Sequence, residues 1–140
     1  MDGMRILVAV DGSEQGYAAL RYGVRLAKRG TPAVLDVLIV ALPVLQAQHL
    51  DEEDESVGLE LPRIRQTVET ILAAEGVEPH ILERRSVDPA ETICRTARDG
   101  GFDDVVMGRW GRSAERAAGR YLGSVAYQVL QTCPCPVTVV

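Results

Sequence analysis

The sequence predicts an α/β fold, an open parallel sheet of five strands with helices on both faces. Apolar runs of strand length alternate with amphipathic helical segments along 140 residues, a length that fits one domain, residues 1–140. Hydrophobic residues make up 46% of the chain, but only 4% are aromatic. The core must therefore be built mainly from aliphatic side chains, as in parallel sheets that helices cover on both sides.

The first half of the chain contains two strand-like runs and two helical segments. Residues Met4–Val10 form a continuous apolar run, which predicts a buried strand. Ser13 can cap a following helix that extends to about residue 29. A second buried strand is expected over 33–42. A polar, acidic segment follows, and apolar residues at helical spacing then predict a helix over 57–74.

The second half repeats this alternation with three more strands. They are expected at 79–87, 103–108 and 136–140, the first of them more polar and nearer an edge of the sheet. Asp88-Pro89 is a strong helix start, because Asp caps a helix and Pro suits its first position. That helix ends at Gly100, and another is expected over 124–131. The order of elements favours right-handed crossovers and a parallel sheet.

A strand order of 3-2-1-4-5 would place the reversal of strand order between the first and fourth strands. Ligands of such sheets bind beyond the carboxyl ends of the strands at this reversal. Asp11 follows the first strand directly, and Gly108 follows the fourth. The sequence therefore predicts one crevice with Asp11 on one side and the segment after Gly108 on the other.

That segment, VMGRWGRSAERAAGRYLGS, contains four glycines and four arginines in an otherwise acidic chain. Gly108 and Gly111 would let the backbone approach a ligand closely. Gly123 and Ser124 stand where the next helix begins, and free N–H groups there form an anion site. Asp11 could accept bonds from a ribose or a base. A phosphate site is one interpretation, and an ordinary glycine-rich connection is the other.

Several motifs in fixed order carry a family resemblance. A first strand ending VAVDGSE, DPAETI at a helix start, VVMG ending the fourth strand, G-x2-G followed later by G-S, and a terminal CPCPVTVV resemble the universal stress protein family from Met4 to Val140. The resemblance implies an adenine nucleotide α-hydrolase-like fold and a homodimer through the last strand. One branch of the family binds ATP with the pattern G-x2-G-x9-G-[S/T], and another branch lacks the pattern and holds no nucleotide.

The resemblance also implies a set of nucleotide-binding positions. They comprise the nucleoside side, the base pocket and the phosphate side: Ala9, Asp11, Ala41, Met107, Gly108, Gly111, Gly123, Ser124 and Val125. The chain departs from the pattern at one point. Eleven residues, Arg112–Leu122, separate Gly111 from Gly123 where the pattern has nine. This departure bears on the phosphate end of the site more than on the base end.

The arginines and the single tryptophan of the segment each have two possible roles. Arg109, Arg112 and Arg120 are candidate phosphate contacts. Arg112, Arg116 and Arg120 are four residues apart, so a helical turn would give one basic face, directed either at a phosphate or into solvent. Trp110 either covers a nucleotide or packs against the loop or a partner subunit, and packing is the favoured reading.

Bulk properties exclude some classes of function. A net charge of -5 argues against general nucleic-acid or anionic-membrane binding. No apolar run approaches the ~20 residues that span a bilayer, and the N-terminus has no signal-peptide pattern, so a cytoplasmic protein is expected.

His49 and His80 have no partners of ligand type, so no metal site is expected. Cys94, Cys133 and Cys135 are expected to be small buried hydrophobes.

Three functions remain, and the first is the favoured prediction. It is a small dimeric stress-response protein that binds ATP, or AMP or ADP, with Mg²⁺ left open, and acts as a sensor or regulator. The second is a nucleotide-free dimerisation module of the same fold. The third is an enzyme, a slow ATPase or phosphotransferase. Efficient hydrolysis is not expected, since no general base or nucleophile is evident and no catalytic residue is assigned. The apolar last strand, with Val137, Val139 and Val140, is the expected dimer strand.

Overall fold

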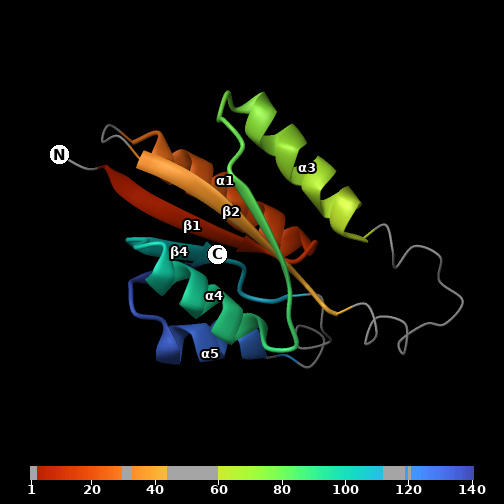
Figure 1. The fold of residues 1–140 in the computed structure, drawn as a ribbon, viewed down its shortest axis with the longest axis vertical. Coiled ribbons are helices and arrows are strands. Elements are labelled where there is room, and N and C mark those ends of the chain that lie inside the picture. The colour runs from red at the N-terminus through yellow and green to blue at the C-terminus, as the bar shows by residue number, and fades with distance from the viewer. Residues whose placement is uncertain (1–2, 30–32, 44–59, 112–118, 120) are drawn as a thin grey trace, which may run out of the picture.

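The computed structural model describes residues 3–29, 33–43, 60–111, 119 and 121–140. Strands and helices alternate along them as the sequence predicts (Figure 1). In chain order they are β1 (Met4–Val10), α1 (Glu14–Ala27), β2 (Ala33–Ala41), α3 (Glu60–Ala74), β3 (Ile81–Arg85), α4 (Pro89–Asp99), β4 (Asp104–Met107), α5 (Ser124–Thr132) and β5 (Val137–Val139).

All five strands are parallel, and their order is β3-β2-β1-β4-β5. The predicted strand order is therefore confirmed. β1 lies at the centre, with β2 on one side and β4 on the other, so the order reverses between β1 and β4. Ala9 of β1 pairs with Met107 of β4, which brings the carboxyl ends of these two strands to the same edge of the sheet.

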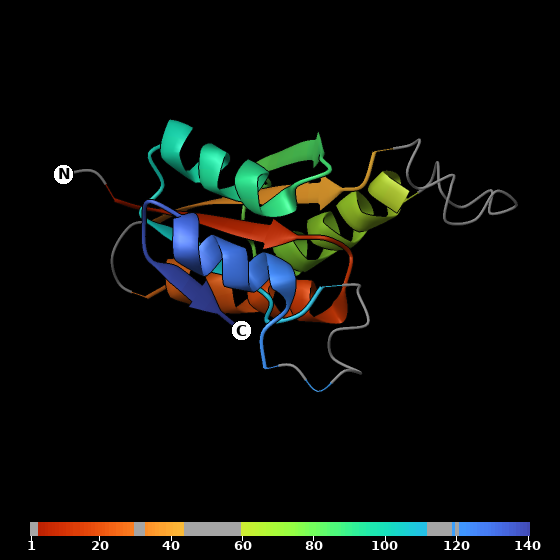
Figure 2. The same ribbon diagram turned by 90° about the horizontal axis from the view of Figure 1, so that it is seen from below.

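Helices cover both faces of the sheet, with α1 and α3 on one face and α4 and α5 on the other (Figure 2). The alternation of side chains along β1 shows the two layers. Ile6, Val8 and Val10 are packed in the cluster with α1 and α3, and Leu7 and Ala9 in the cluster with α4 and α5. Because every residue from Ile6 to Val10 is buried, the strand has an unbroken apolar sequence.

Local capping signals place two of the helix starts as expected. The Ser13 hydroxyl accepts the backbone N–H of Gly16 at 3.1 Å, and an Asp88 carboxylate oxygen accepts that of Glu91 at 3.2 Å.

β3 is shorter than the predicted 79–87 and lies at an edge of the sheet, where its polar residues can meet solvent. α1 ends at Ala27, two residues before the predicted end.

Some sequence predictions concern residues outside the described ranges. These are the basic face of Arg112, Arg116 and Arg120, the acidic run before α3, and His49. Among the helices that the structure describes, none is long and apolar enough to cross a membrane.

Candidate functional site: a pocket at the switch point of the sheet

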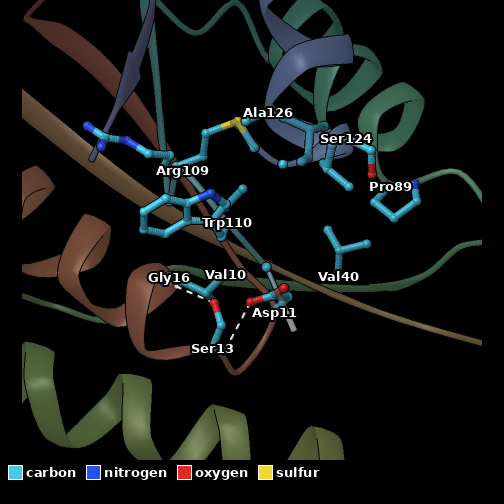
Figure 3. A pocket seen from close by; sticks show the side chains of 17 residues that line it. Val10, Asp11, Ser13, Gly16, Val40, Pro89, Arg109, Trp110, Ser124 and Ala126 are labelled. Atoms are coloured by element: carbon cyan, nitrogen blue, oxygen red, sulfur yellow. Dashed lines mark hydrogen bonds between the residues drawn. The ribbon is translucent and has the colours of Figure 1, made fainter. Parts of the chain in front are cut away.

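A pocket of about 150 Å³ opens where β1 and β4 end (Figure 3). This volume is roughly ten times the space that one water molecule needs, so the pocket is of ligand size. Seventeen residues line it: Ala9, Val10, Asp11, Ser13, Gly16, Val40, Pro89, Ile93, Met107, Gly108, Arg109, Trp110, Gly111, Gly123, Ser124, Val125 and Ala126.

Asp11 lies between the start of α1 and the segment that follows β4. One of its carboxylate oxygens accepts the backbone N–H of Ser13 at 3.0 Å. The other lies against Gly111, where an added Cβ atom would come within 2.6 Å of it. The carboxylate is thus held in place on one side and contacts the loop on the other, as the predicted crevice requires.

Gly108 brings the end of β4 against the first turn of α1. A Cβ atom at this position would lie 2.8 Å from the carbonyl carbon of Gln15 and 3.0 Å from its oxygen. Any side chain here would therefore separate the loop from α1. The glycine has a packing role at the wall of the pocket, which the sequence pattern alone did not reveal.

The two ends of the segment between β4 and α5 are joined by a backbone hydrogen bond. The N–H of Gly123 donates to the carbonyl of Arg109 at 2.8 Å. The N–H of Arg109 in turn donates to the carbonyl of Val140 at 2.9 Å. The eleven-residue spacing therefore does not separate the two halves of the glycine pattern. The N–H of Gly123, at the start of α5, is committed to this closure.

The Arg109 side chain stacks on aromatic rings and extends away from Asp11 (Figure 3). Its guanidinium carbon lies 4.4 Å from the ring centroid of Tyr121 and 5.4 Å from that of Trp110. Its Nε atom is buried and has no hydrogen-bond partner among the described residues. Trp110 also lines the pocket, as do Val10 and Gly16.

Three helices begin at the pocket. Ser13 and Gly16 belong to the start of α1, Pro89 opens α4, and Ser124 opens α5. The N-terminus of a helix carries a partial positive charge. Their convergence favours an anion in the pocket more strongly than the single start of α5 that the sequence indicated.

The structure brings most of the predicted site residues together. Ala9, Asp11, Met107, Gly108, Gly111, Gly123, Ser124, Val125 and Arg109 all line the pocket. Ala41 does not line it, and Val40 does. Alternate residues of a strand face opposite sides, and Val40 packs in the same cluster as Ala9 and Met107. The predicted base-pocket position, Ala41, is thus the neighbour of the residue of β2 that lines the pocket.

Sequence reasoning did not assign several other lining residues to the site. Ser13 was identified only as a cap, and for Trp110 packing against the loop or a partner subunit was favoured over covering a nucleotide. Residues with no assigned role were Val10, Gly16, Ile93 and Ala126. The helix-start signal at Asp88-Pro89 could have located Pro89, since that helix must begin at the same edge of the sheet where β1 and β4 end.

Fold and site together define a doubly wound α/β protein with a pocket at its switch point. The model of the universal stress protein family matches residues 4–140. The chain belongs to the universal stress protein family. Its fold is the adenine nucleotide α-hydrolase-like fold of its structural neighbours, among them a solved universal stress protein.

Similar proteins cover nearly the whole chain. Universal stress protein YxiE of Bacillus subtilis (strain 168) is 30% identical over 147 residues, which cover 97% of each chain. The solved universal stress protein UspA of Lactobacillus plantarum has a TM-score of 0.75 and 24% identity, covering 100% of this chain and 99% of that one. A universal stress protein solved in complex with cAMP has a TM-score of 0.72 and 18% identity, covering 100% and 98%.

Proposed function

We propose that this protein binds an adenine nucleotide in the pocket at the switch point and acts as a stress-response sensor or regulator. One observation carries the proposal. Asp11 and both halves of the glycine pattern line one pocket, although the spacing between the halves is two residues longer than in the family pattern. The solved family member in complex with cAMP supports an adenine nucleotide as the ligand.

The pocket offers a different chemistry to each part of such a ligand. Val40, Ile93 and Met107 provide apolar contacts for the flat base. The Asp11 carboxylate can accept hydrogen bonds from ribose hydroxyls. The start of α5 at Ser124 lines the pocket and directs the positive end of the helix dipole toward a phosphate.

ATP, ADP and AMP are all candidates, and ATP would enter with Mg²⁺. Efficient hydrolysis is not part of the proposal. Asp11 is the one carboxylate among the described lining residues, and it is assigned to the ribose side rather than to a water that attacks a phosphate.

Thermal unfolding with and without nucleotide tests the proposal. A ligand that binds only the folded state at about 100 times its Kd stabilises by roughly 2.7 kcal/mol, which raises Tm by about 5–10 °C in a chain of this size. We expect this shift with MgATP, ADP or AMP and none with MgCl₂ alone. An unchanged Tm at millimolar nucleotide would instead favour the nucleotide-free dimerisation module.

We further propose a homodimer through the free edge of β5. The strand is apolar and pairs with β4 on one side only. Val105 donates to the carbonyl of Pro136, and Val140 donates to that of Met107. In a parallel ladder, hydrogen-bonding groups alternate along the strand, so the N–H groups of Val137 and Val139 point to the free edge. An unpaired edge of this kind favours pairing with a second copy.

Replacing Val139 by proline should convert the dimer to a monomer. Proline removes the outward N–H, keeps an apolar side chain and is tolerated at a sheet edge. The matched variant Val139→Ala keeps the N–H and should remain dimeric. Light scattering coupled to size exclusion gives the mass of each variant. A proline variant that is still dimeric would rule out this interface.

The proposed place of action is the cytoplasm, with no nucleic acid or membrane as partner. The net charge of -5 would repel both polyanionic surfaces. Recovery of the protein in the membrane pellet after cell fractionation would contradict this part of the proposal.

A further inference from the structure

The three cysteines of the chain lie close together where α5 ends. The Sγ atoms of Cys133 and Cys135 are 4.0 Å apart. Cys94, on α4, is buried, and its Sγ lies 3.4 Å from the Thr132 hydroxyl. All three thiols are free in the structure. Neither the nucleotide site nor the dimer strand makes use of this cluster.

We propose that Cys133 and Cys135 are a redox pair, which low-molecular-weight disulfides oxidise reversibly to an intramolecular disulfide. The two sulfurs must approach by about 2 Å to reach bonding distance. Both residues are partly exposed. Pro134 between them and Pro136 after Cys135 are exposed, so a small oxidant can reach the pair. Cys94 is less suited, because it is buried against the last turn of α5.

The reaction is a double thiol–disulfide exchange. The thiolate of one cysteine attacks a sulfur of the small disulfide, forms a mixed disulfide and releases one small thiolate. The thiolate of the second cysteine then attacks the protein sulfur of that mixed disulfide and releases the other small thiolate. The protein loses two protons and two electrons, and the oxidant is reduced to two thiols.

The surroundings of the pair set its rate of reaction. Burial raises the pKa of both thiols, and the carboxylates of Asp103 and Asp104 raise that of Cys135 further. Cys94 is the other titratable neighbour of the pair. Since the thiolate is the attacking form, oxidation should be slow at neutral pH and accelerate up to about tenfold per unit of added pH.

The turn that contains the pair belongs to the same structural unit as the pocket. Cys133 caps the C-terminus of α5, whose N-terminus lines the pocket, and Cys135 leads into β5. At the other end, Val140 accepts from Arg109, and Arg109 accepts from Gly123. Helix, turn, strand and these two hydrogen bonds form a closed ring. A disulfide would tighten this ring at the end opposite the pocket.

Peptide mapping after equilibration in glutathione redox buffers tests the pair. Free thiols are blocked with N-ethylmaleimide under acid quench and the protein is cut with trypsin. Cleavage after Arg120 leaves Cys133 and Cys135 in peptide 121–140, whereas Cys94 lies in peptide 86–95. We expect peptide 121–140 to carry no label and to be about 2 Da lighter than its reduced form. A doubly labelled peptide in the most oxidising buffer would overturn the proposal.

Two variants assign the sulfurs. Cys94→Ser should oxidise as the native protein does, and Cys135→Ser should stop at a mixed disulfide with glutathione on Cys133. A cross-link between peptides 86–95 and 121–140 in the native protein would overturn the assignment in favour of Cys94. The wild-type map and Cys94→Ser decide the question even if Cys135→Ser does not fold. None of these measurements depends on nucleotide binding.

Discussion

Replacing Asp11 by alanine should weaken adenine-nucleotide binding by about 10- to 100-fold. The variant would lack the hydrogen bonds that the carboxylate makes to the ribose. A hydrogen bond to a charged group contributes roughly 1.5–3 kcal/mol. About 1.4 kcal/mol corresponds to a factor of ten in Kd. Calorimetric titration of the purified variant with ATP and AMP gives the loss directly.

Two amide variants separate this effect from a change in the fold. Asp11→Asn keeps a side-chain oxygen that can accept the N–H of Ser13, so the start of α1 should be preserved while the negative charge is lost. Asp99→Asn makes the same change of charge at an exposed residue at the end of α4, away from the pocket, and should bind as the native protein does. Native affinity in Asp11→Ala would exclude a role for this carboxylate.

Replacing Gly108 by alanine should reduce both stability and binding. The new methyl group would meet the backbone of Gln15 at 2.8 Å, and backbone cannot rotate away as a side chain can. Overpacking of this kind costs about 1–3 kcal/mol of the free energy of unfolding. Displacement of the β4 end should also lower nucleotide affinity by about tenfold or more. Urea unfolding and calorimetric titration measure the two losses separately.

Gly111→Ala is the matched comparison in the same segment. Its methyl group would meet the Asp11 carboxylate at 2.6 Å, the end of a side chain that can move. Binding should therefore fall while stability changes less than in Gly108→Ala. Equal loss of stability in the two variants, with no loss of affinity in either, would contradict the roles assigned to these glycines.

The fold was predictable because its signals are local and agree with one another. The apolar run Met4–Val10, the caps Ser13 and Asp88, and the alternation of strands and helices each indicated the same sheet. The strand order needed more than periodicity. The order 3-2-1-4-5 was a premise from which the crevice between Asp11 and Gly108 followed, and the pairing of β1 with β4 confirms that order.

The sequence predicted which residues lie around the pocket, but not which contacts they make there. Motif residues at the ends of β1 and β4 line the pocket, because the topology brings these two strand ends to the same edge of the sheet. Ala41 came from the family resemblance, whereas Val40 lines the pocket because alternate residues of β2 face opposite sides of the sheet. The stacking of Arg109 on Tyr121 was beyond prediction, since it depends on how the ends of the segment between β4 and α5 meet.

The pocket contains the single tryptophan of the chain, so its fluorescence tests the central claim most directly. Titration with ATP, AMP and cAMP should change the Trp110 emission saturably, with one nucleotide bound per chain, and CTP should compete poorly. Asp11→Ala should shift the titration to higher concentration. No change in emission with any adenine nucleotide up to millimolar concentration would contradict nucleotide binding in this pocket.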